Sequence, residues 1–145
     1  MTVQTMDLTT MDRSALDELF RSSPPGPIPT GRSRGTAIIA PGSVLDGLFR
    51  LLIRALIWKG KVFRAESHDL KNRLGPIGTL GIRANVYQDE SWFSPGPAII
   101  LDYSKTSFVA RMIRDEIRQV APNVYLGQIY LWKRRVGLFC LEFPA

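Results

Sequence analysis

Residues 100–120, ILDYSKTSFVARMIRDEIRQV, concentrate chemically active side chains between an apolar segment and a charged one. Six polar or ionisable residues follow one another there: Asp102, Tyr103, Ser104, Lys105, Thr106 and Ser107. A catalytic loop needs such groups, but so does a strand-to-helix turn, where Thr106 or Ser107 is well placed as the N-cap. Along a strand, Asp102 and Tyr103 point to opposite faces and cannot act together. We favour the structural interpretation, with Tyr103 as the candidate functional residue, because it can lie in an apolar lumen and still donate a hydrogen bond.

Two further polar side chains interrupt apolar strands near the C-terminus. NVYLGQIYLW and VGLFCLEF flank KRR, a pattern that indicates an antiparallel hairpin. Gln128 and Tyr130 alternate onto the same face as Val124, Leu126 and Trp132. If that face lines a barrel, two hydrogen-bonding groups project into an apolar cavity, as in sites for hydrophobic small molecules. The alternative is that both groups only satisfy buried backbone.

The candidate residues therefore form two groups. The predicted catalytic residues, which would polarise a carbonyl, are Tyr103, Gln128 and Tyr130. The predicted ligand contacts, made by large apolar side chains, are Phe49, Trp58, Val124, Leu126 and Trp132.

The densest charges in the chain are interpreted as structural. The segment RMIRDEIR holds Arg111, Arg114, Asp115, Glu116 and Arg118 at the spacing of ion pairs across a helix turn. The sequence predicts a solvated helix face there, with no acid–base role.

Motifs for cofactors are not supported. GPIGTLG lacks the dinucleotide-binding glycine spacing, and WKGKV lacks the earlier glycine and the Ser or Thr of a P-loop. One histidine, His68, and one cysteine, Cys140, provide no set of soft metal ligands. We expect His68 in a polar loop and Cys140 in the middle of a strand, so the two are not favoured as a catalytic nucleophile and its base. We expect no cofactor and no metal.

Length and composition favour one domain of 145 residues with 45% hydrophobic side chains. The net charge of +6 allows a basic surface at Arg32, Arg34, Lys133, Arg134 and Arg135 that attracts nucleic acid or acidic lipid. Aromatic residues here lie among leucines and isoleucines instead of on a basic sheet face, so a nucleic-acid partner is not favoured. Without a signal-like N-terminus or an apolar run long enough to span a bilayer, we expect a cytoplasmic protein. The sequence leaves the oligomeric state open.

Helices and strands are predicted from the spacing of apolar residues and from the proline and glycine residues that interrupt them. A helix over SALDELFRS and a proline-rich connector over residues 23–31 form an N-terminal region, residues 1–31, ahead of a single domain of residues 32–145. That domain holds a nearly all-apolar helix over 44–58, a second helix over 108–120, and strands within 35–40, 61–66, 70–74, 79–88 and 97–103 before the final hairpin.

Strands that are apolar on both faces need cover on both sides. In a chain of this length, a closed or half-closed antiparallel sheet is the natural solution. We therefore predict an α+β fold: a small antiparallel β-barrel or half-barrel of lipocalin-like type, with about three helices on or across it.

The C-terminal block LDYSKTSFVARMIRDEIRQVAPNVYLGQIYLWKRRVGLFCLEF, with GRSRGTAIIAPGS and WKGKVF, resembles an uncharacterised family of small bacterial single-domain proteins. That resemblance spans residues from about 15 to the end and implies one domain without assigning any catalytic residue. By architecture alone, a small apolar barrel is similar to the lipocalin-like cyclases of polyketide pathways.

These observations lead to a first functional hypothesis. The barrel encloses an apolar polyketide- or terpenoid-like molecule and directs its cyclisation or isomerisation, including cycloaddition, by confinement and hydrogen bonding. The first alternative is a non-catalytic carrier of lipid or another hydrophobic small molecule. The second is a basic protein that binds nucleic acid or a membrane surface.

Overall fold

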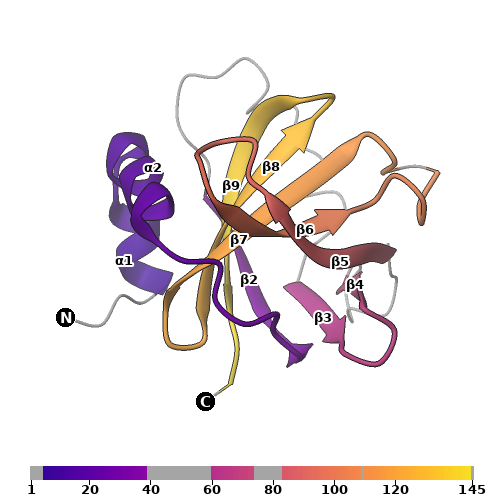
Figure 1. Ribbon diagram of the computed structural model, residues 1–145. Coiled ribbons are helices and arrows are strands. Elements are labelled where there is room, and N and C mark those ends of the chain that lie inside the picture. The colour runs from indigo at the N-terminus through magenta and orange to yellow at the C-terminus, as the bar shows by residue number, and fades with distance from the viewer. Residues whose placement is uncertain (1–4, 39–59, 74–82, 109, 145) are drawn as a thin grey trace.

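The described strands form one antiparallel sheet that curves into a nearly closed barrel (Figure 1). The computed structural model describes residues 5–38, 60–73, 83–108 and 110–144. The strands are β1 (Gly31–Arg32), β2 (Arg34–Ile38), β3 (Gly60–Arg64), β4 (Asp69–Arg73), β5 (Arg83–Glu90), β6 (Pro97–Asp102), β7 (Ile113–Ala121), β8 (Val124–Leu131) and β9 (Arg134–Glu142). Their order in the sheet is β1-β3-β4-β5-β6-β7-β8-β9-β2.

A single bent segment brings the two edges of this sheet together. β1 pairs with β3, whereas β2, one residue later in the chain, pairs with β9 at the other edge. Ser33 lies at the bend, and its N–H donates to the carbonyl oxygen of Lys61 at 2.9 Å. Its hydroxyl donates to the same oxygen at 2.7 Å and accepts from the Lys61 N–H at 3.0 Å. The barrel predicted from two-faced apolar strands is confirmed, because these bonds join its edges.

Alternation along the strands separates two apolar clusters. The interior cluster includes Phe63, Leu70, Val86, Ile99, Leu101, Ile117, Tyr125, Phe139 and Leu141. The outer cluster includes Ile38, Ile100, Val124, Leu126, Leu138 and Cys140. The strands β6, β8 and β9 contribute to both clusters, which explains why they are apolar on both faces.

Two short helices cover the outer cluster. They are α1 (Thr5–Thr10) and α2 (Arg13–Ser22), and Figure 1 shows them together on one side of the barrel. Asp12 caps α2 by accepting from the Ala15 N–H at 2.8 Å, as expected of an N-cap. Leu8, Leu16 and Phe20 are buried against the outer face of the sheet. The predicted helix over SALDELFRS is confirmed, and α1 is an addition to it.

The helix predicted over residues 108–120 is wrong, because Ile113–Ala121 form strand β7 between β6 and β8. The segment satisfies a helical pattern through Val109, Met112, Ile113 and Ile117, but it also alternates through Ile113, Asp115 and Ile117. Two strands offer hydrogen bonds to both of its edges, and this long-range pairing overrides the local helical pattern. The predicted solvated helix face is wrong for the same reason, since Asp115, Glu116 and Arg118 are buried.

The hairpin at the C-terminus is confirmed, with Leu131 paired with Arg134 across a two-residue turn. Both turn residues, Trp132 and Lys133, have positive φ angles of 49° and 67°. The helix predicted over 44–58 lies outside the described residues. The described residues therefore contain two helices, where about three were predicted for the whole chain.

Candidate functional site

Three ionisable side chains meet inside the barrel. Lys61 comes from the start of β3, Tyr103 follows β6, and Asp115 lies in β7. The Lys61 Nζ donates to the Tyr103 Oη at 2.7 Å and lies 3.3 Å from the Asp115 Oδ2. The Tyr103 Oη donates to the same carboxylate oxygen at 3.5 Å. All three side chains are buried, and we call them the interior triad.

The sheet places these groups by its alternation. On β3, Lys61 and Phe63 are both buried, whereas the residues on either side of Phe63 are partly exposed. On β7, Asp115 lies two residues before Ile117 of the interior cluster and pairs with Leu101 on β6. Tyr103 belongs to the same cluster. The triad is therefore set into an otherwise apolar interior.

Burial dominates the electrostatics of the triad. Desolvation lowers the pKa of the Lys61 ammonium, although the nearby Asp115 carboxylate acts in the opposite direction. Desolvation also raises the pKa of the Asp115 carboxyl, against the effect of Lys61. Burial therefore acts against the charged forms of both groups, while the attraction between them favours those forms.

The arrangement has features that acid–base chemistry requires. Among the described residues, the Asp115 Oδ1 has no hydrogen-bond partner. An unpaired buried acceptor of this kind costs stability, and such atoms in native structures call for an explanation. The Lys61 Nζ also lies 5.4 Å from the ring centroids of Tyr103 and Phe139, so aromatic faces enclose it. The triad brings a hydroxyl group, a carboxyl group and an amine within 3.5 Å of one another.

Backbone contacts fix the position of Lys61. Gly60 has a φ angle of 121°, and a Cβ there would lie 2.5 Å from the Ser33 carbonyl oxygen. Only glycine fits this close approach, so the chain enters β3 directly against the bend at Ser33. The bonds that close the barrel thus also hold the backbone that carries the Lys61 side chain.

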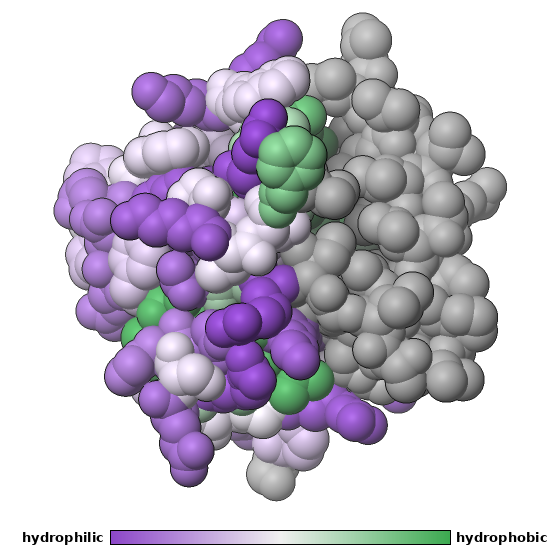
Figure 2. Space-filling model, turned by 90° about the vertical axis from the view of Figure 1, so that its right-hand side faces the viewer, coloured by the Kyte–Doolittle hydropathy of each residue, from purple (hydrophilic) through white to green (hydrophobic). Residues whose placement is uncertain are grey.

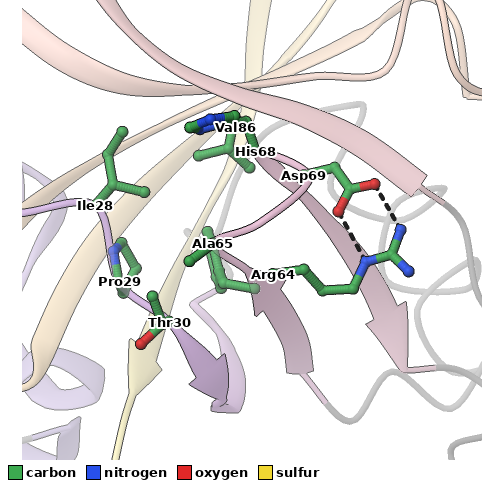
Figure 3. A pocket seen from close by; sticks show the side chains of 9 residues that line it. Ile28, Pro29, Thr30, Arg64, Ala65, His68, Asp69 and Val86 are labelled. Atoms are coloured by element: carbon green, nitrogen blue, oxygen red, sulfur yellow. Dashed lines mark hydrogen bonds and ion pairs between the residues drawn. The ribbon is translucent and has the colours of Figure 1, made fainter.

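A pocket of about 220 Å³ lies at one end of the barrel (Figure 3). It opens between the connector before β1 and the turn from β3 to β4, and its lining is mostly apolar. The lining residues are Ile28, Pro29, Thr30, Phe63, Arg64, Ala65, His68, Asp69 and Val86. Phe63 and Val86 also belong to the interior cluster. Phe63 lies two residues after Lys61 on the same side of β3, whereas the triad residues themselves do not line this pocket.

The rim of this pocket is fixed by ion pairs. Figure 3 shows Arg64 reaching the Asp69 carboxylate, and its Nε donates to Oδ1 at 2.8 Å. Arg83 donates to Oδ2 at 2.8 Å. His68, in the turn between the strands, has a φ angle of 51°, a left-handed conformation that costs free energy for a residue other than glycine.

The outer surface near β3 and β4 is more polar than the lining of the pocket. Figure 2 shows the described part of this face as mostly hydrophilic, with separate small hydrophobic areas. A binding site for an apolar molecule therefore fits the pocket and interior better than this part of the surface.

The structure places Gln128 and Tyr130 outside the barrel, so the predicted orientation of this strand face is wrong. Both residues lie on the side of β8 that carries Leu126, which packs in the outer cluster under the helices. Gln128 accepts from Arg135 at 3.4 Å, and Tyr130 packs edge-on against Trp92 at 5.3 Å between ring centroids. Both faces of the strand are apolar, so alternation alone does not tell which face turns inward.

Three of the predicted ligand contacts also lie outside the barrel interior. Val124 and Leu126 pack in the outer cluster, and Trp132 is 73% exposed in the β8–β9 turn. Phe49 and Trp58 lie outside the described residues. Tyr103 is the one predicted catalytic residue that the described structure places inside the barrel.

Sequence reasoning missed Lys61 and Asp115. Each interrupts an apolar alternation, before Phe63 on β3 and between Ile113 and Ile117 on β7. That signal is readable once the segment is known to be a strand. For β7 it was hidden by the helical interpretation.

Comparisons with known proteins support the fold. A crystal structure of a protein from Thermomonospora curvata is similar over 93% of this chain and 89% of that one, with a TM-score of 0.63 and 22% identity. At this identity the likeness shows the fold alone. No family model matches the chain, and no curated protein matches it.

The described residues offer neither a metal site nor a helix that could span a membrane. No group of three or more His, Cys, Asp or Glu side chains in that part of the chain is placed to hold a metal ion. None of the described helices has the length and hydropathy needed to cross a bilayer.

Proposed function

We propose that the protein is an enzyme that binds a small, mostly apolar carbonyl compound and catalyses its isomerisation or cyclisation. The observation that carries this proposal is the interior triad, three buried ionisable groups in contact within an apolar barrel. Ionisable groups with shifted pKa values beside an apolar pocket are typical of acid–base sites.

In the proposed reaction, the Tyr103 hydroxyl donates a hydrogen bond to the substrate carbonyl. The Asp115 carboxylate removes a proton from the carbon next to the carbonyl. The electron pair of that C–H bond forms a C=C bond, and the carbonyl π electrons move to the oxygen to give an enolate. The Lys61 ammonium stabilises that negative charge. Asp115 then returns the proton to another carbon, or the enolate carbon attacks a second carbonyl carbon of the same molecule and closes a ring. In that second case the π electrons of the attacked carbonyl move to its oxygen, which takes the proton back from Asp115. No atom is gained or lost in either outcome.

A structural role for the triad is the competing interpretation, because buried ion pairs also occur without chemistry. The unpaired Asp115 Oδ1 and the nearby pocket favour the enzymatic role. A polyketide- or terpenoid-like substrate remains the class that fits an apolar pocket with few polar groups.

The first experiment uses isomerisation of a β,γ-unsaturated cyclic ketone, followed by the ultraviolet absorbance of the conjugated product. We expect turnover by the wild-type protein and a loss of about 10²-fold or more in Tyr103→Phe, the usual range for removal of a general acid. Tyr87→Phe is the matched control, since the Tyr87 hydroxyl donates to Asp102 at 2.8 Å, outside the triad.

A second measurement identifies the natural ligand. Organic extraction of the purified full-length protein and mass spectrometry should recover an apolar carbonyl compound. Binding of such a compound without any chemical change would contradict an enzyme and support the carrier. Absence of both turnover and binding would leave the triad a structural feature.

A further inference from the structure

Two connections at one end of the barrel present aromatic and basic side chains together. The β8–β9 turn and the connection from β6 to β7 lie at the same end of the barrel in Figure 1. The Trp132 N–H donates to the Met112 carbonyl at 3.1 Å, which fixes one connection against the other. Leu131 and Ile113 are paired next to this bond.

The most exposed large hydrophobic residues of the described structure lie in these two connections. Phe108 is 79% exposed and Trp132 is 73% exposed. The Arg111 guanidinium lies over the Phe108 ring at 4.4 Å from its centroid. Lys133 and Arg134, directly after Trp132, are also exposed. We call this set, Phe108, Arg111, Trp132, Lys133 and Arg134, the aromatic–basic tip.

The two residues of the β8–β9 turn adopt a backbone conformation that their residue types rarely take. A two-residue hairpin turn with two positive φ angles normally takes Asn and Gly, which adopt that conformation readily. Here Trp132 and Lys133 occupy both positions, at φ angles of 49° and 67°. Neither side chain is buried, so packing in the core does not explain the choice. Backbone strain at an exposed site is a reason to look for a function of the side chains there.

Charge indicates the kind of partner. Residues 103–112 and 132–135 contain Lys105, Arg111, Lys133, Arg134 and Arg135, and no acidic residue. A bilayer that contains anionic lipids attracts such clusters, and tryptophan is enriched at the level of the lipid headgroups.

Nucleic acid fits the same side chains less well. Binders of single strands stack bases on aromatic residues spread over a sheet face. The inner side of the described sheet is lined by the buried interior cluster, and its outer cluster packs beneath the two helices. The exposed rings of the tip instead project from turns, a placement suited to insertion between headgroups.

We propose that the aromatic–basic tip docks the protein on a membrane surface that contains anionic lipids, with Trp132 and Phe108 entering the interface and Arg111, Lys133 and Arg134 contacting headgroup phosphates. This inference stands independently of the proposed enzymatic activity. It adds a route by which an apolar ligand, dissolved in the bilayer, reaches the protein.

The test is co-sedimentation of the full-length protein with vesicles at low ionic strength. One set contains phosphatidylcholine alone, and the other contains phosphatidylcholine with phosphatidylglycerol. We expect binding to the second set and its loss at high salt, because the charges are exposed and screened. Absence of binding to the anionic vesicles, or equal binding to both sets, would overturn the proposal.

Variants separate the two parts of the tip. Lys133→Gln/Arg134→Gln removes two charges, and we expect binding to weaken about tenfold or more. Trp132→Asn/Phe108→Ser removes both rings, and Asn suits the positive φ angle at 132, so this variant should fold and also bind about tenfold or more weakly. Near-ultraviolet circular dichroism and thermal unfolding verify that each variant is folded.

The matched control is Arg32→Gln/Arg34→Gln, which removes one exposed charge from β1 and one from β2. Arg34 pairs with Glu142, at the opposite end of β9 from Arg134. The control variant should bind vesicles like the wild-type protein. An equal loss in this control would mean that net charge, not the tip, attracts the vesicles. Retention of a labelled oligonucleotide that tip variants lose, without any vesicle binding, would replace the membrane with nucleic acid.

Discussion

Lys61 and Asp115 are a buried pair whose stability and chemistry can be separated by mutation. Removing one partner leaves an uncompensated polar group in the barrel, so Lys61→Met should lower the free energy of unfolding by about 3–5 kcal/mol. The double variant Lys61→Met/Asp115→Leu replaces both groups by apolar ones and should recover most of that loss. Urea denaturation of the two variants measures the difference.

The same double variant tests the function. A folded Lys61→Met/Asp115→Leu protein should isomerise the β,γ-unsaturated ketone no faster than buffer. If the double variant kept its activity, the pair would have a structural role only. If it were as unstable as Lys61→Met, the energetic argument would be wrong.

Asp69 provides a pH-dependent contribution to stability. Hydrogen bonds from Arg64 lower the pKa of the Asp69 carboxyl well below its usual range; burial opposes this shift, and Arg83 adds to it. A folded-state pKa below the unfolded value of about 3.9 stabilises the fold at neutral pH, and this stabilisation is lost as pH falls below about 4.

Asp69→Asn should therefore lower the free energy of unfolding by about 1–2 kcal/mol at neutral pH, since it weakens hydrogen bonds between charged groups. The difference from the wild-type protein should shrink at pH of about 3. Urea unfolding at both pH values measures it. Asp89→Asn, at an exposed position of β5, serves as the control, and a difference that grew toward low pH would contradict the sign of the effect.

At the scale of the elements, the packing of β8 against β9 requires a small residue, Gly127, opposite a large one, Phe139. A Cβ at Gly127 would lie 2.2 Å from the Phe139 ring, which belongs to the interior cluster. The glycine therefore provides the space that the ring fills between the paired strands, and the interior is packed at this level.

Gly127→Ala should lower the free energy of unfolding by about 1–3 kcal/mol, the usual cost of overpacking a core. The same change in a Phe139→Leu background should cost clearly less, because the smaller side chain leaves room for the methyl group. Thermal and urea unfolding of all four proteins give the coupling. Equal costs in both backgrounds would show that Phe139 is not the obstacle.

Helix α2 and strand β7 show where local sequence is sufficient and where it is not. α2 has an N-cap at Asp12 and one apolar face, and both signals lie within ten residues of each other, so it was predicted correctly. β7 has a helical pattern and an alternating pattern at once. Hydrogen bonds from β6 and β8 decide between them, and these partners are not visible within a local window.

At the scale of the whole molecule, the barrel depends on the bend at Ser33. The Ser33 hydroxyl makes two hydrogen bonds to the backbone of Lys61 and is itself buried. Ser33→Ala should lower the free energy of unfolding by about 1–3 kcal/mol through the Lys61 N–H left without that acceptor.

The effect of Ser33→Ala on local unfolding should be confined to the strands next to the bend. Amide hydrogen exchange in β1 and β3 should become faster in Ser33→Ala, while β8, paired on both sides, stays protected. Ser22→Ala is the control, because the Ser22 hydroxyl bonds only within the end of α2. Faster exchange spread evenly over the sheet would show that Ser33 does not act as a local closure.

The sequence by itself determined the class of fold. Strands that are apolar on both faces require cover on both sides, which predicts a small barrel with helices outside, and turn residues mark the final hairpin. It also marked Tyr103 as a hydroxyl suited to an apolar lumen. These conclusions depend on periodicity and local chemistry, which a single chain displays in full.

Tertiary structure alone decided which face turns inward. Gln128 and Tyr130 alternate with apolar residues as an interior pair would, yet β8 turns that face toward the helices. Lys61 and Asp115 are 54 residues apart in the sequence, with Tyr103 between them. Only the curvature of the one sheet that contains β3, β6 and β7 brings the three side chains together. Alternation has a period of two whichever face is buried, so the inward face depends on closure of the whole barrel.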